Sequence, residues 1–204
     1  MNALILVDVQ YDFLPGGALA VENGDEIIPV LNSLQKKFDL VVATQDWHPQ
    51  DHGSFASNHK NKKPFEKAKL GGLDQILWPD HCVRGMKGSE FSSELNLHRA
   101  EAIIRKGTDS GIDSYSGFFD NGKKKATGLG DYLKGRDVNR VFIGGLAADF
   151  CVGFTALDAL ELGFDTIVVE NGTRPIDKDG WEKMKDSIRK KGGKIVPSSK
   201  IKLT

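Results

Sequence analysis

The chain has 204 residues, and its 28 Lys and Arg balance 28 Asp and Glu, so the formal net charge is zero. This balance excludes the strongly basic surface of a dedicated nucleic-acid-binding domain and gives no reason to expect a membrane-surface protein. The 39% hydrophobic and 27% charged residues indicate a globular chain with its own core, and two cysteines, Cys82 and Cys151, are too few for a disulfide framework.

Six short apolar runs rich in β-branched residues predict buried strands of a parallel sheet. They cover residues 3–7, 40–43, 102–104, 141–146, 166–169 and 194–196. The first run ends at Asp8 and is too short for a secretion signal or a membrane span, so we expect a cytoplasmic protein.

Helical spacing of apolar residues occurs between several of these runs. It predicts helices over about 27–38, 129–133, 152–162 and 181–188, and Gly163 and Gly192 supply stop signals after the last two. Strands that alternate with helices predict an α/β fold in which helices cover both faces of a parallel sheet.

Residues 49–100 break this alternation. The segment contains three prolines, the pair Gly71 and Gly72, and many lysines. We predict that it is a long loop excursion over the carboxyl edge of the sheet, within a single domain of residues 1–204. We expect its lysines to form a solvated face rather than a binding patch; they are Lys60, Lys62, Lys63, Lys67 and Lys69.

Cys151 is the strongest candidate for a nucleophile, because it lies where the run 141–146 gives way to a helix. A helix N-terminus lowers the pKa of a thiol, and the small Ala147 and Ala148 leave backbone N–H groups approachable for an oxyanion. A buried cysteine that acts as a small hydrophobic residue explains the position equally well.

Asp8 and Lys106 follow or end other predicted strands, and parallel sheets bind ligands at the carboxyl ends of their strands. A carboxylate can take a thiol proton, and an ammonium group can stabilise the thiolate. Each residue alone is better explained as a strand cap or an ion pair. Their expected convergence with Cys151 on one sheet edge favours a catalytic site.

Asp46 and His48 alternate in sequence, so in an extended chain both side chains can reach one metal ion. His81 offers a third ligand, and His52 offers a fourth ligand or a partner of the ligands. One carboxylate and two imidazoles suit zinc, iron or manganese. We expect this set to be separate from the nucleophile and its partners, and we expect Cys82 to pack rather than react.

Several common catalytic motifs are missing from the sequence. It has no Gly-x-Ser-x-Gly elbow, no phosphate-binding P-loop, no Gly-x-Gly-x-x-Gly fingerprint and no Cys-x-x-Cys pair. These absences weigh against a serine hydrolase, a P-loop enzyme, a nicotinamide-dependent dehydrogenase and a thioredoxin.

Seven motifs between residue 6 and about residue 160 together resemble, in order, the isochorismatase-like cysteine hydrolases and their nicotinamidase branch. The motifs are LVDVQYDF (6–13), TQDWHP (44–49), HGSFA (52–56), WPDHCV (78–83), KG (106–107), DSYSGFFDN (113–121) and GLAADFCV (145–152). The resemblance implies a Rossmann-like three-layer α/β/α sandwich around a six-stranded parallel sheet.

The resemblance also implies roles for individual residues. It implies a catalytic triad of Asp8, Lys106 and Cys151; oxyanion donors on Ala147 and Cys151, after a cis peptide at Leu146–Ala147; metal ligands Asp46, His48 and His81; and ring contacts from Phe13 and Trp78, with Tyr115 nearby. The position of His52 is a ligand in some members of the family and not in others.

The reaction implied is hydrolysis of nicotinamide to nicotinate and ammonia through a thioester, a step of NAD salvage, with pyrazinamide as a second substrate. One divalent metal ion is implied, zinc before iron or manganese. Three alternatives stay open: a cysteine hydrolase of another small amide or N-carbamoyl compound, a non-catalytic binding protein, and a metal-dependent hydrolase in which Cys151 is structural. We expect no nucleic-acid or membrane partner, and the sequence leaves the oligomeric state open.

Overall fold

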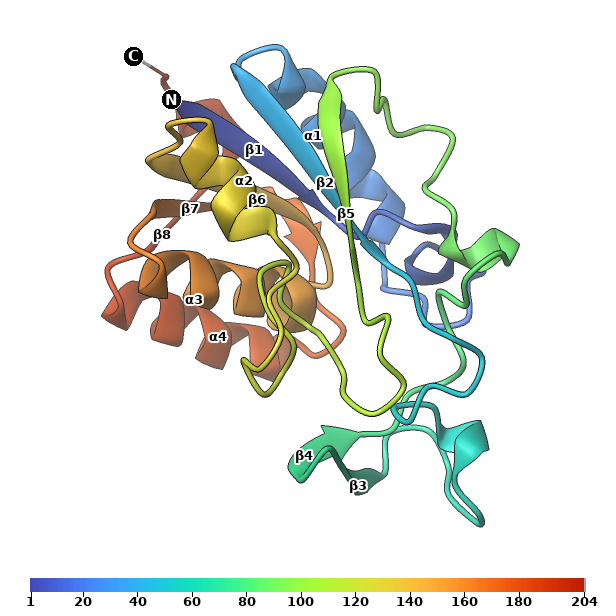
Figure 1. Ribbon diagram of the computed structural model, residues 1–204. Helices are drawn as coiled ribbons and strands as arrows, with labels where there is room; N and C mark the ends of the chain where they lie inside the picture. The colour runs from blue at the N-terminus through green and yellow to red at the C-terminus, as the bar shows by residue number, and fades with distance from the viewer. Residues whose placement is uncertain (204) are drawn as a thin grey trace.

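The computed structural model describes residues 1–203, and its centre is a twisted six-stranded sheet (Figure 1). The strands lie in the order β5-β2-β1-β6-β7-β8, and every pairing among them is parallel. Their bounds are Asn2–Val7 (β1), Leu40–Asp46 (β2), Ala100–Lys106 (β5), Arg140–Leu146 (β6), Asp165–Arg174 (β7) and Lys194–Val196 (β8). The predicted strands and their parallel arrangement are confirmed.

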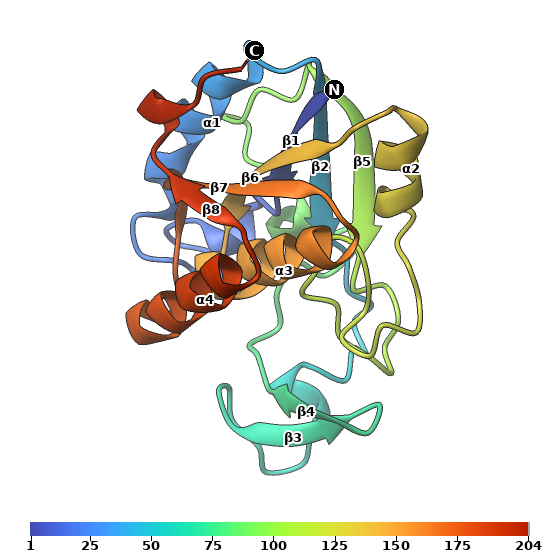
Figure 2. The same ribbon diagram turned by 90° about the vertical axis from the view of Figure 1, so that its left-hand side faces the viewer.

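Helices cover both faces of the sheet, as Figures 1 and 2 show. The four helices of the described chain are Ile27–Gln35 (α1), Leu129–Gly135 (α2), Gly153–Glu161 (α3) and Lys178–Lys190 (α4). Side chains of β1 alternate between the faces. Leu4 and Leu6 are buried with α1, whereas Ile5 and Val7 are buried with α2, α3 and α4. The structure is therefore the three-layer α/β/α sandwich expected.

Strand β5 differs from the prediction of strands buried on both faces. From Ala100 to Arg105 its residues alternate between partly buried and exposed, with Ile103 49% exposed, and only Lys106 at its end is buried. The physical reason is position, because β5 lies at the edge of the sheet and pairs only with β2. The apolar run 102–104 therefore marks a strand with one solvent-facing side.

The excursion over residues 49–100 contains regular structure that the sequence did not predict. An antiparallel hairpin of Lys67–Leu70 (β3) and Leu73–Ile76 (β4) extends away from the main sheet (Figures 1 and 2). Gly71 and Gly72 make its two-residue turn with φ values of 58° and 85°, which suit glycine. The five lysines expected to be solvated are all exposed.

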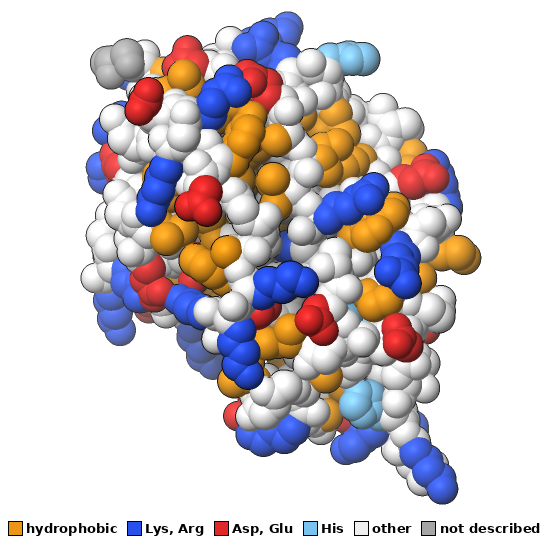
Figure 3. All heavy atoms as spheres, in the orientation of Figure 1, with side chains coloured by type: hydrophobic (Ala, Val, Ile, Leu, Met, Phe, Trp, Pro, Cys, Tyr) orange, Lys and Arg blue, Asp and Glu red, His pale blue; other side chains and the backbone are white. Residues whose placement is uncertain are grey.

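Acidic and basic side chains are interspersed on the face that Figure 3 shows, as the balanced composition predicts. Hydrophobic side chains reach this surface between them. Within residues 1–203, no helix has both the length and the apolar character that a membrane span requires.

Gly145 of β6 allows the backbones of β6 and β1 to approach closely, and a substitution there tests how tightly the two strands pack. Its φ is 137°, and a Cβ there would lie 1.9 Å from the carbonyl oxygen of Val7. We expect Gly145→Ala to lower the free energy of unfolding by about 2 kcal/mol or more, because strain and overlap both act on backbone atoms. For a chain of this length that corresponds to a fall in Tm of about 4 °C or more.

Gly135→Ala in α2 is the matched control, because no atom lies within 4 Å of the added Cβ. We expect its Tm to stay equal or rise slightly, as alanine favours helix. Thermal unfolding followed by circular dichroism measures both variants, and equal Tm values for the two would contradict the close approach at Gly145.

Candidate active site

Four neighbouring strands direct the candidate residues to one edge of the sheet. Strand order runs outward from β1 through β2 to β5 and, on the other side, from β6 through β7 to β8, so it reverses between β1 and β6. Open parallel sheets bind ligands at such a reversal, outside the carboxyl ends of the strands. Asp8 follows β1, Asp46 ends β2, Lys106 ends β5, and Cys151 lies just beyond β6.

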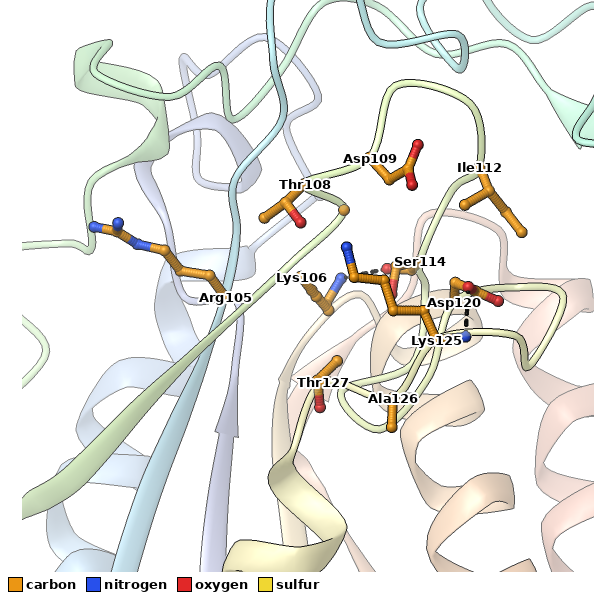
Figure 4. A pocket seen from close by; sticks show the side chains of 11 residues that line it. Arg105, Lys106, Thr108, Asp109, Ile112, Ser114, Asp120, Lys125, Ala126 and Thr127 are labelled. Atoms are coloured by element: carbon orange, nitrogen blue, oxygen red, sulfur yellow. Dashed lines mark hydrogen bonds between the residues drawn. The ribbon is translucent and has the colours of Figure 1, made fainter.

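The ammonium group of Lys106 is the centre of this arrangement, and its side chain is fully buried. Its Nζ lies 2.9 Å from Asp8 Oδ2, 2.5 Å from Asp46 Oδ1 and 3.4 Å from Cys151 Sγ. Nζ also donates to the carbonyl oxygen of Ser114 at 2.9 Å, a bond drawn in Figure 4. Burial lowers the pKa of Lys106, but the two carboxylates outweigh it, so the pKa lies well above its usual range.

One carboxylate oxygen of Asp8 is fixed by a hydrogen bond, and the other faces the ammonium group of Lys106. Oδ1 accepts from the hydroxyl of Thr44 at 2.6 Å, and the backbone has a φ of 49°, a left-handed value that aspartate tolerates. Oδ2 is buried and accepts no hydrogen bond of good geometry from residues 1–203. Burial raises the pKa of Asp8, although Lys106 opposes the shift. Asp8 is therefore a fitting acceptor for a nearby thiol proton.

Cys151 lies in a π-helical turn, Ala148–Val152, that leads from β6 into α3. The expectation that the helix start lowers the pKa of this thiol is wrong. Burial raises the pKa well above its usual value, Lys106 opposes the shift, and the carboxylate of Asp8 adds to it. The thiol therefore begins protonated and needs a base. The cis peptide expected at Leu146–Ala147 is present before this turn.

Asp46, His48 and His81 are brought together, with one ligand atom from each lying within 4.8 Å of the others. The Nδ1 atoms of both histidines face carbonyl oxygens at 2.8 Å, those of Gly107 for His48 and Pro79 for His81. A carbonyl only accepts, so Nδ1 carries a proton in each ring, and Nε2 is the atom left to bind a metal ion. Two oriented imidazoles and a carboxylate are the donor set that a divalent metal ion requires.

The electrostatics of these residues agree with a cation site. Burial opposes ionisation of Asp46, but Lys106 and His48 hold its pKa well below the usual range. Burial and the charge of His48 lower the pKa of His81 to about 4, so this imidazole is neutral near pH 7. For His48, burial acts to lower the pKa, and the carboxylate of Asp46 raises it above the usual value.

The expected separation between the metal ligands and the nucleophile is wrong, because Asp46 belongs to both groups. Its Oδ1 contacts Lys106 Nζ, while Oδ2 lies 3.6 Å from His48 Nε2. The amide of Gln10 fixes Asp46 through the backbone, donating to its carbonyl and accepting from its N–H, both at 2.8 Å. One rigidly held carboxylate therefore joins the two halves of the site.

His52 lies beside the set of Asp46, His48 and His81 rather than within it. Its ligand atom groups with those of His48 and Asp113, and its ring centroid is 4.3 Å from that of His48. Nδ1 lies 2.7 Å from the hydroxyl of Ser54, and Nε2 is buried with no hydrogen-bond partner in residues 1–203. Burial, together with His48, lowers its pKa to about 4.

A narrow cleft opens beside the site, and Asp46, His81 and Cys151 are among the residues that line it. The three predicted ring contacts all line it; they are Phe13, Trp78 and Tyr115. Sequence reasoning missed four further lining residues: Leu19, Asp113, Phe150 and Ile176. The position of Phe150 next to Cys151 was an available signal, and its ring lies edge-on to Trp78 with centroids 4.9 Å apart.

The excursion contributes to the cleft through Gln75 of β4, a buried residue that sequence reasoning also missed. Its Nε2 lies 2.9 Å from Asp113 Oδ2 and 3.1 Å from the hydroxyl of Tyr115. The hairpin therefore orients two residues of the cleft wall, which explains why the excursion is structured near the site.

A larger cavity lies next to the end of β5 (Figure 4). Arg105, Thr108, Asp109 and Lys125 are among its lining residues, and none of the described residues that line it is a cysteine or a histidine. The smaller cleft contains Cys151, Asp46 and His81, so we identify the cleft as the candidate active site.

Comparison with known proteins agrees with this geometry. A family model of the Isochorismatase domain matches residues 2–199. The nicotinamidase of Acinetobacter baylyi is 48% identical over 187 residues, which cover 89% of this chain and 87% of that protein. The solved structure of the Acinetobacter baumanii nicotinamidase–pyrazinamidase has a TM-score of 0.95 at 46% identity, covering 97% of this chain and 96% of its own.

A more distant solved structure contains a metal. The pyrazinamidase of Pyrococcus horikoshii in complex with zinc has a TM-score of 0.79 at 39% identity, and the match covers 96% of this chain and 98% of that one. The family model and the close relatives each cover most of the chain. The chain therefore belongs to the isochorismatase family.

Proposed function

We propose that this chain hydrolyses nicotinamide to nicotinate and ammonia, with Cys151 as the nucleophile, as a single catalytic domain. The observation that carries the proposal is the 3.4 Å contact between Cys151 Sγ and Lys106 Nζ, beside Asp8 and on a cleft lined by aromatic residues. The names of the relatives support the same substrate, and the Acinetobacter baumanii relative supports pyrazinamide as a second one.

The first half of the reaction forms a thioester. Asp8 takes the proton of Cys151, and the thiolate attacks the carboxamide carbon of the substrate. Backbone N–H groups of Ala147 and Cys151 donate to the oxyanion that develops on the carboxamide oxygen. Asp8 then gives the proton to the departing ammonia as the carbon–nitrogen bond breaks.

The second half releases nicotinate. Water attacks the thioester carbon, Asp8 accepts a proton from that water, and the sulfur leaves and is reprotonated. Lys106 acts as a fixed positive charge, since its pKa lies well above the usual range and it contacts both Asp8 and the sulfur. Dividing amide hydrolysis in this way replaces one difficult step by two easier ones.

The pyridine ring binds between the aromatic residues of the cleft, which are Phe13, Trp78 and Tyr115. Flat rings gain from offset stacking and edge-to-face contact in addition to burial, by about 1 kcal/mol for each pair. The mutual edge-on packing of Trp78 and Tyr115, with centroids 6.3 Å apart, keeps these walls in place before the substrate arrives.

A divalent metal ion fits Asp46, His48 and His81, and we propose zinc, whose common ligands in proteins are these residue types. The fit rests on charge and on the orientation of the two rings, whose Nδ1 atoms are bonded to carbonyl oxygens and whose Nε2 atoms are left for the ion. Two buried carboxylates, Asp8 and Asp46, face one ammonium, Lys106, which leaves an excess negative charge for a cation. When bound, the ion supplies a positive centre that orients the ring nitrogen of the substrate. His52 stays outside this proposed set.

Replacing each of the two cysteines in turn distinguishes the nucleophile from a cysteine that only packs. We expect Cys151→Ala to reduce kcat for nicotinamide by about 10⁴-fold or more, because no other group forms the thioester. We expect Cys82→Ala to keep most of the activity, since Cys82 is fully buried and its thiol pKa is raised by burial. Ammonia release measures turnover, and circular dichroism checks the fold. Near-normal turnover by a folded Cys151→Ala would show that the nucleophile assignment is wrong.

The ring nitrogen provides a test on the wild-type protein. Nicotinamide and pyrazinamide both carry a nitrogen at the required position, so we expect both to be hydrolysed. Benzamide lacks this nitrogen, and we expect its kcat/KM to be lower by about 100-fold. The reason is that one specific polar contact is lost and its partner in the protein is left desolvated. Equal efficiency on nicotinamide and benzamide would refute recognition of the ring nitrogen. Preference for an N-carbamoyl compound would favour the alternative cysteine hydrolase.

Elemental analysis tests the ligand assignment. We expect about one divalent ion per chain in the wild type, and we expect His81→Ala to lose most of the bound ion and of the activity on nicotinamide. His98→Ala is the matched control, because His98 is exposed and lies outside the set. Chelation should inactivate the wild type, and zinc should restore it. A fully active preparation without metal would overturn the assignment, and restoration by iron or manganese alone would overturn the choice of zinc.

A further inference from the structure

Asp149 lies two residues before Cys151 in the same π-helical turn, and the proposed reaction gives it no role. The residue is 5% exposed. Its Oδ1 accepts from the backbone N–H of Ile176 at 2.9 Å, and its Oδ2 accepts from the N–H of Asp177 at 2.8 Å. These two partners lie 27 and 28 residues further along the chain, in the loop between β7 and α4.

This loop forms part of the cleft wall. Ile176 lines the cleft together with Phe150 and Cys151, which belong to the turn that contains Asp149. The next residue, Asp177, caps α4 through its own side chain, which accepts from the N–H groups of Asp179 and Gly180. The carboxylate of Asp149 therefore joins the nucleophile turn to another segment of the cleft wall, at the point where α4 begins.

A carboxylate suits this position better than the other residue types of its size. Both oxygens accept from backbone N–H groups, and the start of a helix favours a negative charge. Burial raises the pKa of Asp149, and the two N–H groups oppose that shift. Asparagine offers one carbonyl oxygen and would turn its NH₂ group toward the second N–H, which would leave a buried donor without an acceptor.

We propose that Asp149 is a positioning residue for substrate binding, which holds Ile176 at the distance from Cys151 that fits the pyridine ring. This proposal rests on the proposed nicotinamide hydrolysis only in that the kinetic test measures turnover of nicotinamide. The two hydrogen bonds engage both carboxylate oxygens, so Asp149 acts through Ile176 and not as an acid or a base. The wall contact is equal for bound substrate and transition state, and its loss therefore raises KM and leaves kcat unchanged.

The test compares three variants on nicotinamide. We expect Asp149→Asn to raise KM about tenfold and to change kcat less than about threefold, and we expect Ile176→Ala to do the same. The double variant should be no worse than the more affected single variant, because both changes remove one wall contact. Asp179→Asn is the matched control: it makes the same change at an exposed residue in the first turn of α4, so we expect KM to stay as in the wild type.

Hydrogen exchange provides a readout that does not depend on activity. We expect the amides of Ile176 and Asp177 to exchange about tenfold faster in Asp149→Asn than in the wild type. Unchanged exchange, an unchanged KM, a fall in kcat alone, or KM effects that multiply in the double variant would each overturn the proposal. Ile176→Ala keeps it falsifiable if Asp149→Asn does not fold, since an unchanged KM in that variant overturns it too. A wild type that fails to hydrolyse nicotinamide would contradict the proposed function instead, and the exchange rates would then decide about Asp149.

Discussion

A fully buried ammonium group at the end of β5 is the constraint on which the rest of the site depends. An uncompensated charge of this kind costs several kcal/mol, and breaking a buried ion pair costs about 3–5 kcal/mol. Lys106 is paired with two carboxylates, Asp46 at the end of β2 and Asp8 just after β1. The register of the sheet supplies one of these ion pairs, since Asp46 pairs directly with Lys106. Folding of the sheet and assembly of the site are the same event for these three residues.

The remaining parts of the site are held by side chains that form hydrogen bonds to a segment distant in sequence. Gln10 binds both backbone groups of Asp46, Gln75 binds two residues of the cleft wall, and Asp149 binds two N–H groups of the loop before α4. Such contacts restrict loops that the sheet alone would leave loosely placed. The walls of the cleft are therefore held by hydrogen bonds within the protein, which reduces the ordering that substrate binding requires.

Much of this could be predicted because it depends on local pattern. Apolar runs mark the strands, and polar residues at their ends converge once the sheet is parallel, which is how Asp8, Lys106 and Cys151 were identified. The hairpin at 67–76 was missed because Lys67 and Lys69 alternate with only Ala68 and Leu70, a weak strand signal. Ile176 and the sharing of Asp46 depend on contacts between segments far apart in sequence. The raised pKa of Cys151 likewise reflects burial, which overrides the helix start.

The two oxygens of Asp46 have a consequence for how such a site can diverge. Oδ1 contacts Lys106 Nζ at 2.5 Å, and Oδ2 faces His48 Nε2 at 3.6 Å. A substitution that adapts this carboxylate to another ion also changes the charge beside the sulfur. The preference for an ion and the environment of the nucleophile therefore cannot change independently. Without an ion, two buried carboxylates face one ammonium, so a descendant that abandons the ion is expected to neutralise Asp46 and keep the buried pair of Asp8 and Lys106.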